Sequence, residues 1–254
     1  MRRIVVKVGS AVLTQDGEIA LKRMRALVAF LVELKKENEV ILVSSGAVSA
    51  GYTALKLDRT ILSNKQALAA IGQPILLGKY AKKFLPFNII TSQVLVTAAN
   101  LNKPDDTSRI NDTINTLLVN NILPIINEND ATATDELEVG DNDQLSAYIA
   151  KDTGADLLII LSDIDAYYDA DPREHIHAEV LKVVNTISEE ELNNSPTPNN
   201  IFATGGIVTK LKAASYLLEA NIDTFLASGF DLRDAKSFAL HSTHIGGTLF
   251  TKVK

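Results

Sequence analysis

The stretch NENDATATDELEVGDNDQL, residues 127–145, is the chemical centre of the sequence. It follows the apolar run at residues 122–126, and no Lys or Arg occurs between it and Lys151. Most acidic runs of this kind are solvated loops. This one, however, leaves the carboxyl end of a predicted strand, and open α/β sheets bind their ligands at that edge. We therefore expect an α/β protein with a polar site formed around this loop.

Strand-like and helix-like segments alternate on both sides of the loop. Short β-branched runs predict buried strands, and apolar residues at helical spacing predict amphipathic helices. The predicted strands are residues 3–8, 40–43, 87–90, 122–126, 156–161, 225–227 and 248–250. The predicted helices are residues 21–37, 65–85, 113–121, 146–155 and 207–220, with a helix start after Gly46 and a polar connection at residues 100–112. The alternation indicates an α/β fold, a three-layer αβα sandwich with a central, mainly parallel sheet.

Length and composition limit the class of protein. The 254 residues, 46% of them apolar, suffice for one large α/β domain or two modest ones. A net charge of −6 gives no basic surface for nucleic acid or for an anionic membrane. No apolar run approaches the ~20 residues that cross a bilayer. The N-terminal segment superficially resembles a signal peptide, but Lys7 interrupts its apolar part. We expect a cytoplasmic protein that binds neither nucleic acid nor membrane; cysteine is absent, so thiolate metal sites are excluded.

Two lysines occupy unusual positions for a cation. Lys7 lies inside a predicted buried strand, where an ammonium group needs a partner or a ligand; the ordinary alternative is a lysine that extends to solvent from an edge strand. Lys210 lies in the first turn of a predicted helix, where it opposes the helix dipole and suggests an anion between them; the alternative is a surface lysine. Gly205 and Gly206 precede that helix and allow close approach of a ligand to the backbone.

Two polar turns follow predicted strands. The first, SSGA at residues 44–47, suits either an anion or close helix packing; the segment from Gly46 resembles a Walker A loop, but Tyr52 and Thr53 stand where Lys and Ser/Thr must follow, so a P-loop is excluded. The second begins at Ser162 and continues into AYYDADPR, which either borders a ligand or forms a simple Asp-Pro turn. Cations, small-residue turns and a carboxylate–amide loop suit phosphoryl transfer. The residues alone therefore predict a nucleotide-dependent α/β enzyme.

Seven blocks, in order, resemble the catalytic domain of the glutamate 5-kinases, a family of the amino acid kinase superfamily with its carbamate kinase-like fold. The blocks are VVKVGS (5–10), SSGAVSAG (44–51), NENDATAT (127–134), VGDNDQLSA (139–147), LSDIDAYYDADPR (161–173), TGGIVTKLKAA (204–214) and GTLF (247–250). They span nearly the whole chain, so we assign residues 1–254 to one catalytic domain. The resemblance implies transfer of the ATP γ-phosphate, with Mg²⁺, to the side-chain carboxylate of L-glutamate, the first step of proline biosynthesis.

The same resemblance implies roles for individual residues. Lys7 and Lys210 would stabilise charge on the phosphoryl group, and Asp143, with Asp141 as a weaker candidate, would hold these lysines in place. The acceptor acid would contact Ser45, Gly46, Asn127, Asp130 and Asn142, with Asp130 facing the substrate ammonium. The nucleotide would contact Lys7, Gly9, Ser10, Ser162, Asp163, Tyr168, Asp171, Thr204, Gly205, Gly206, Ile207 and Lys210. No residue is assigned to the metal, because Mg²⁺ keeps several waters and would mainly bridge ATP phosphates.

The sequence departs from the family pattern in two places. Many bacterial members continue into a small PUA domain, whereas we expect only the catalytic domain here. Ile207 stands where Met is usual, an apolar exchange that should leave phosphate binding unchanged. The resemblance also implies a homo-oligomer, a dimer or tetramer, and feedback inhibition by L-proline.

Two classes of rival function are weighed against this one. The first is a kinase for N-acetylglutamate, aspartate, carbamate or uridine monophosphate, which shares the fold. An acylated amine, however, would not need Asp130 as a counter-charge. The second is a non-catalytic nucleotide-binding sensor, which would not need both Lys7 and Lys210.

Overall fold

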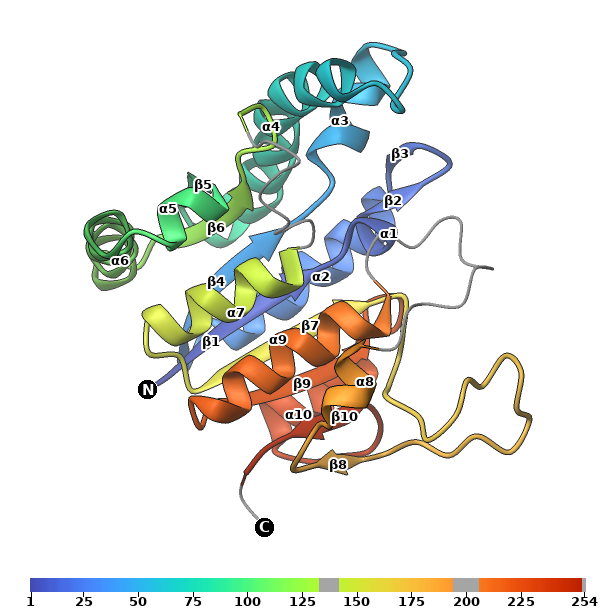
Figure 1. The fold of residues 1–254 in the computed structure, drawn as a ribbon. Coiled ribbons are helices and arrows are strands. Elements are labelled where there is room, and N and C mark those ends of the chain that lie inside the picture. The colour runs from blue at the N-terminus through green and yellow to red at the C-terminus, as the bar shows by residue number, and fades with distance from the viewer. Residues whose placement is uncertain (133–141, 194–205, 253–254) are drawn as a thin grey trace.

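Eight strands form one sheet in the order β5-β6-β4-β1-β7-β9-β10-β8, and helices cover both of its faces (Figure 1). The computed structural model describes residues 1–132, 142–193 and 206–252. The strands are β1 (Arg2–Val8), β4 (Asn38–Ser44), β5 (Thr91–Val96), β6 (Leu123–Glu128), β7 (Leu157–Ser162), β8 (Val183–Val184), β9 (Asp223–Ser228) and β10 (Thr248–Phe250). Only the β10–β9 pairing is antiparallel in this sheet, as far as the described residues show. The predicted three-layer sandwich with a mainly parallel sheet is confirmed.

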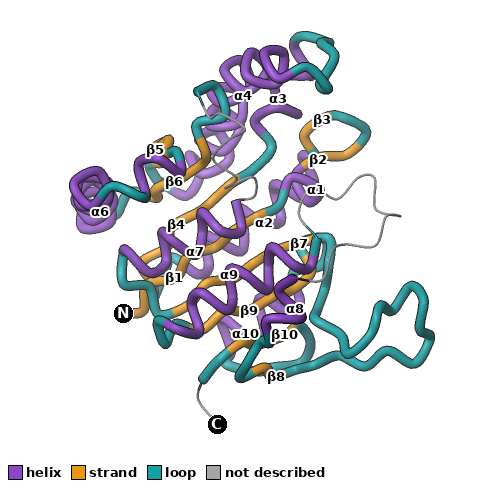
Figure 2. Tube along the Cα trace, viewed as in Figure 1, coloured by secondary structure: helices purple, strands orange, loops and turns teal. Residues whose placement is uncertain are grey.

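The helices divide between the two faces of the sheet (Figure 2). They are α1 (Ser10–Leu13), α2 (Leu21–Leu34), α3 (Ala47–Ala54), α4 (Leu62–Phe84), α5 (Ala98–Leu101), α6 (Pro104–Val119), α7 (Asn142–Asp152), α8 (Glu189–Asn193), α9 (Ile207–Glu219) and α10 (Arg233–His241). One core cluster joins α2 and α4 to Ile4, Val6 and Val8, and a second joins α7 and α9 to Val5. Successive strand residues point to opposite faces, so Lys7 shares the α7–α9 face with Val5.

Strand β1 lies in the interior of the sheet. It pairs with β4 on one side and with β7 on the other, and Lys7 is opposite Val43 and Ile160. A lysine reaching solvent from an edge strand is therefore excluded, because β1 is not an edge strand and Lys7 is only 2% exposed. Its ammonium group must be stabilised inside the protein.

Two predicted segments are wrong. In place of the strand predicted at residues 87–90, a 3-10 helix η1 (Leu85–Phe87) and Asn88, with a left-handed φ of 56°, form a turn, and β5 begins at Thr91. The polar connection at residues 100–112 is wrong because α6 begins at Pro104. Proline at the first helical position, followed by acidic residues in the first turn, favours a helix start. The hairpin β2 (Thr14–Gln15) and β3 (Glu18–Ile19), as well as α10, lies outside the predicted elements.

Helices α3 and α4 touch through their backbones. A Cβ atom added at Gly72 would lie 1.7 Å from the carbonyl oxygen of Ala47, and one at Gly51 would lie 1.9 Å from that of Leu68. Glycine is needed at both positions because no side chain fits between the two helices. The small residues after β4 thus serve close helix packing, one of the two uses predicted for them.

Replacing Gly72 with Ala is expected to destabilise the fold by about 3 kcal/mol, since an extra methyl group in a packed contact costs up to roughly that much. For a chain of this length the melting temperature should fall by about 6–12 °C. Gly78→Ala is the matched control on the same helix, because nothing lies within 4 Å of its added Cβ. That variant should melt at or above the wild-type temperature, since Ala favours a helix by ~1 kcal/mol over Gly. Equal melting temperatures for the two variants in a thermal scan would contradict the contact.

In the part of the chain that the structure describes, no helix is both long and apolar enough to cross a membrane.

Candidate active site

Three buried charged side chains meet at the carboxyl edge of the sheet. Lys7 Nζ forms an ion pair with Asp143 Oδ1, and Lys210 Nζ donates to Asp143 Oδ2 at 3.0 Å. Asp143 is fully buried, and Lys7 and Lys210 are 2% and 3% exposed. A Cβ atom on Gly9 would lie 3.8 Å from Lys7 Nζ, which places this ammonium group beside the turn that ends β1. The structure brings together three residues that the sequence predicts as catalytic.

Helix ends explain why Asp143 occupies this position. It is the second residue of α7, and a carboxylate in the first turn of a helix is favoured by the helix dipole. Lys210 lies in the first turn of α9, where the dipole opposes a cation. The ion pair with Asp143 offsets that repulsion and satisfies the charges that the sheet and helices bury.

Thr209 is a site residue that the sequence analysis missed. Its hydroxyl donates to Asp143 Oδ2 at 2.9 Å, beside the Lys210 contact, and also approaches the carbonyl oxygen of Gly206 at 2.9 Å. The only signal was its place in the block between Gly206 and Lys210. Thr209 fixes the rotamer of Asp143 and ties it to the start of α9.

A second cluster, of amide groups and hydroxyls, adjoins these charges. The Asn142 Nδ2 group, which has two hydrogens to donate, lies within hydrogen-bonding distance of three acceptors: the carbonyl oxygen of Ser44 at 3.0 Å, Ser45 Oγ at 2.8 Å and Asn127 Oδ1 at 2.8 Å. Asn142 precedes Asp143 at the start of α7, so the two clusters share one helix end. The cluster joins the ends of β4 and β6, and contains three of the residues predicted to bind the acceptor acid.

The side-chain amide of Asn127 is buried, and only its oxygen is hydrogen-bonded among the described residues. The residue is 3% exposed, and its Oδ1 accepts from Asn142 and from the backbone N–H of Glu128. Its Nδ2 group is buried without a hydrogen-bond acceptor among the described residues. A buried donor of this kind costs free energy unless a ligand supplies the acceptor. The geometry suits a carboxylate or phosphate oxygen.

Asp130 lies just beyond β6 and is half-buried. Burial raises the pKa of its carboxyl group from 3.8 to about 6, because the charged form loses solvation. A ligand ammonium group beside it would restore the ionised form. Asp130 is therefore a suitable partner for an amine.

Several of the predicted glycines lie in turns at the same edge, although the backbone N–H of Gly9 already donates to the carbonyl oxygen of Leu161 at 3.0 Å. Gly46 precedes α3 with φ at 100°, a left-handed conformation that glycine adopts readily. Gly9 and Ser10 follow β1, and Gly206 and Ile207 begin α9, so both pairs lie at the edge that holds the two lysines. Asp141, Thr204 and Gly205 lie outside the described residues.

The predicted nucleotide residues on the β7–β8 connection form local contacts of their own. Ser162 ends β7, and its Oγ donates to Asp163 Oδ1 at 2.9 Å. Tyr168 donates to the Asp165 carboxylate at 3.2 Å. Asp171 pairs with Arg173 at 2.5 Å, and this contact lowers the pKa of the Asp171 carboxyl group to about 2. Ser162 thus lies at the sheet edge, whereas Figure 1 shows the rest of this connection extending away from the sheet.

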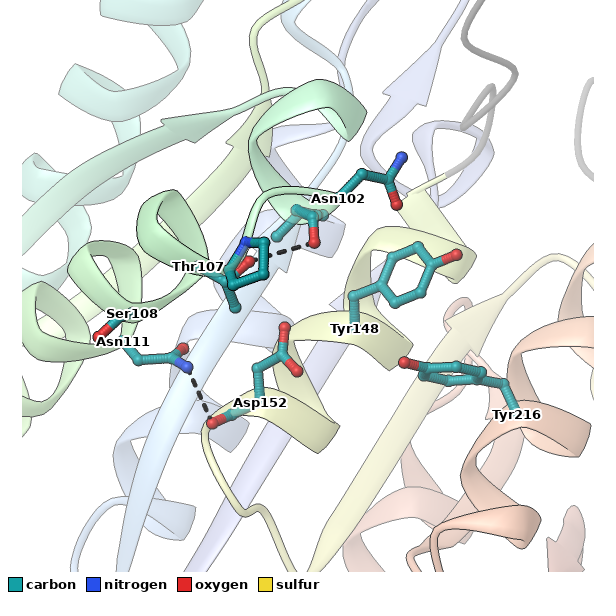
Figure 3. A pocket seen from close by; sticks show the side chains of 9 residues that line it. Asn102, Thr107, Ser108, Asn111, Tyr148, Asp152 and Tyr216 are labelled. Atoms are coloured by element: carbon teal, nitrogen blue, oxygen red, sulfur yellow. Dashed lines mark hydrogen bonds between the residues drawn. The ribbon is translucent and has the colours of Figure 1, made fainter.

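A separate groove of about 590 Å³ lies between α5 and α6 on one side and α7 and α9 on the other (Figure 3). Tyr148 and Tyr216 form one wall, with ring centroids 5.0 Å apart in an edge-to-face arrangement. Its one charged lining residue is Asp152, at the opposite end of α7 from Asp143. Without a lining cation the groove does not suit a phosphate-bearing ligand.

The charge and amide clusters together can hold an anion beside a carboxylate acceptor. Two ammonium groups at one point stabilise negative charge that develops on a transferring phosphoryl group. Among residues 1–132, 142–193 and 206–252, no group of three or more His, Cys, Asp or Glu side chains could hold a metal ion.

Comparisons with known proteins identify the relatives of this chain. Residues 2–228 match the amino acid kinase family. A glutamate 5-kinase of Wolinella succinogenes is 52% identical, over 99% of this chain and 98% of that protein. A glutamate 5-kinase of Leishmania donovani is 48% identical, over 98% of this chain and 95% of that protein.

Solved structures show the same fold at low sequence identity. An isopentenyl phosphate kinase superposes with a TM-score of 0.68 at 16% identity, and the match covers 98% of this chain and 100% of that chain. The carbamate kinase from Giardia lamblia bound to AMP-PNP superposes with a TM-score of 0.66 at 17% identity, covering 99% and 98% of the two chains. The carbamate kinase-like fold predicted from the sequence blocks is confirmed.

Proposed function

The chain belongs to the amino acid kinase family, and we propose that it transfers the γ-phosphate of ATP to the side-chain carboxylate of L-glutamate. The product is L-glutamyl 5-phosphate, the first intermediate of proline biosynthesis. The protein is a transferase of the glutamate 5-kinase type, as its relatives at about half identity over nearly the whole chain are named. The alternatives, another acceptor acid or a nucleotide sensor, are not favoured.

One observation carries the proposal: the Lys7–Asp143–Lys210 cluster adjoins the Asn127 and Asn142 amides at the start of α7. The lysines would stabilise the phosphoryl group during transfer. The free Asn127 Nδ2 donor and the Asp130 carboxylate would bind the α-carboxylate and the ammonium group of glutamate.

The acceptor needs no general base, because a side-chain carboxylate is already ionised near neutral pH. Catalysis then consists of alignment and charge stabilisation. Asp143 does not react. It holds Lys7 and Lys210 in one place, and Thr209 holds Asp143.

ATP is the co-substrate, and Mg²⁺ would accompany it and offset negative charge on its phosphates during transfer. Within this chain, Ser10, Gly206 and Ile207 would offer backbone groups to the nucleotide, and Gly9, which has no side chain, would let it approach closely. Ser162, Asp163, Tyr168 and Asp171 would lie around it. Thr204 and Gly205 would complete this set from outside the described residues.

The extent of the catalytic domain, the oligomeric state, the location and the inhibition by proline are each proposed on a different observation. The sheet takes strands from both ends of the sequence, which supports one catalytic unit over residues 1–254. Leu85, Phe87 and Ile90 are 71%, 50% and 67% exposed beside edge strand β5, which supports a homo-oligomer. A cytoplasmic location would supply both ATP and glutamate. L-Proline keeps the carboxylate and the amine that Asn127 and Asp130 would bind, which supports feedback inhibition there.

The function is tested by acyl phosphate formation with ATP and Mg²⁺, trapped by hydroxylamine. L-Glutamate should yield product, whereas N-acetyl-L-glutamate and L-aspartate should not. L-Proline should raise the apparent KM for glutamate. Product from another acid alone would overturn the acceptor, and no product from any acid would overturn the enzymatic function.

The activity is expected to depend on the ionisation of Asp130. Since the raised pKa of its carboxyl group is about 6, the group becomes protonated and neutral as the pH falls through that value. It then loses its attraction for the substrate ammonium, so kcat/KM for L-glutamate should fall about tenfold per pH unit below pH 6. Above about pH 7 the profile should be flat.

Asp130→Asn is the control for this profile. It should have a low kcat/KM for glutamate at every pH and should lack the step near pH 6. A wild-type profile that is flat between pH 5 and pH 7, measured by initial rates, would contradict the role of Asp130.

A further inference from the structure

Helix α4 contacts the ends of both strands that carry the acceptor-acid cluster. Gln73 and Tyr80 lie seven residues apart, so they share one face of the helix, roughly two turns or 10 Å apart. Both are buried, at 7% and 0% exposure. Neither belongs to the residues described above as binding substrate or nucleotide.

Tyr80 holds the end of β4. Its hydroxyl and Ser44 Oγ are 3.0 Å apart, and burial raises the pKa of the Tyr80 hydroxyl, which keeps it neutral and able to donate. Ser44 is the last residue of β4, and its carbonyl oxygen accepts from Asn142 Nδ2. The contact therefore fixes the backbone that also places Ser45.

Gln73 holds the end of β6. Its Nε2 group donates to the carbonyl oxygen of Glu128 at 3.3 Å, and its Oε1 accepts from Gln93 Nε2 at 2.9 Å. The bond from Gln93 sets the orientation of the Gln73 amide, because only Oε1 can accept. Glu128 is the last residue of β6 and lies between Asn127 and the turn that carries Asp130.

The two contacts bridge strand ends that are far apart in the sequence. Gly72, the neighbour of Gln73 on α4, packs against Ala47 at the start of α3. Helix α4 therefore also fixes the position of α3, which follows Ser45 and Gly46. Helix α4 thus contacts both the Ser45 wall and the Asn127 wall of the cluster, and Asn142 spans the distance between them with its hydrogen bonds.

We infer that Gln73 and Tyr80 are positioning residues for the acceptor acid, which hold the two walls of its binding site at a fixed separation from one face of α4. The inference rests on the proposed function for the identity of the acid. It assigns their effect to acid binding, because the contacts of Gln73 and Tyr80 end on Glu128 and Ser44, whereas the charges of Lys7 and Lys210 meet on Asp143 at the start of α7.

The test compares Tyr80→Phe, Gln73→Met and Ser44→Ala with the wild-type enzyme in the hydroxylamine assay. Each of the three should raise the KM for L-glutamate about tenfold, since a lost buried hydrogen bond displaces one wall. The KM for ATP should stay within about twofold, since the phosphate cluster is intact. The double variant Tyr80→Phe with Ser44→Ala should match Ser44→Ala alone, because that exchange already removes the Tyr80 bond, together with the bond from Ser44 Oγ to the carbonyl oxygen of Ser45.

Leu76→Met is the matched control. Leu76 is buried on α4 between the two residues, and the exchange conserves volume without touching a polar contact, so both KM values should remain at the wild-type level. An unchanged KM for glutamate in both Tyr80→Phe and Gln73→Met, with an active wild type, would overturn the inference alone. An equal rise in both KM values would also overturn it, since that indicates general loosening. A wild type that forms no glutamyl phosphate would instead overturn the proposed function, and the acid-specific role with it.

Discussion

Replacing Lys210 with Ala is expected to lower kcat for acyl phosphate formation by about 10³-fold, the size of effect seen when one preorganised donor to a transition-state charge is removed. The ammonium group of Lys210 is buried and fixed by Asp143, so water cannot replace it during transfer. The KM for L-glutamate should change by less than about threefold, because the acid is bound by the amide cluster rather than by this lysine. Single-turnover measurements with saturating ATP and glutamate would separate the chemical step from binding.

Lys212→Ala is the control for Lys210. Lys212 lies two residues further along α9 and is exposed, so its loss should leave kcat within about twofold of wild type. Lys210→Ala should still fold, because Asp143 keeps its ion pair with Lys7. A folded Lys210→Ala protein with wild-type kcat would remove the lysine from the mechanism.

The sequence predicted the layers and the central strands correctly because those features are encoded locally. Residues 3–8, RIVVKV, form a short run rich in β-branched residues, which needs no distant information to be recognised as a strand. Local signals failed where two of them competed. Phe87 and the isoleucines after it suggest a strand, yet Asn88 turns the chain, and the real strand β5 is a half-exposed, more polar edge.

The residue patterns alone predicted the candidate site only to the level of its residue types, whereas the family resemblance named Asp143 as the partner of both lysines. The lysine in a buried strand indicated a charged partner, and the acidic loop offered several. That Asp143 is this partner depends on α7 and α9 meeting over β1, a contact between residues 67 positions apart for Lys210. Gln73 and Tyr80 carry no local signal, since a Tyr or Gln on an amphipathic face is ordinary, and the only signal for Thr209 was its place between Gly206 and Lys210. Their roles follow from tertiary packing, which a single sequence does not state.

Asp143→Asn is expected to lower both stability and activity more than any other single exchange considered. The substitution keeps the shape of the side chain but leaves Lys7 and Lys210 without the anion that they share. Removing one partner from a buried charge cluster costs about 3–5 kcal/mol. The melting temperature should therefore fall by about 10 °C, and kcat by roughly 10³-fold or more, because neither ammonium group keeps its position.

Stabilisation by ATP can distinguish the loss of charge in Asp143→Asn from a simple packing defect. If the two lysines face the ATP phosphates, ATP supplies the missing negative charge and should raise the melting temperature of Asp143→Asn by more than it raises that of the wild type. Adenosine, which lacks phosphates, should not do so. Asp152→Asn, at the other end of the same helix and half-buried, is the matched control and should retain activity. Equal stabilisation of the Asp143→Asn protein by ATP and by adenosine would place the lysines away from the phosphates, and the catalytic role assigned to the cluster would then be wrong.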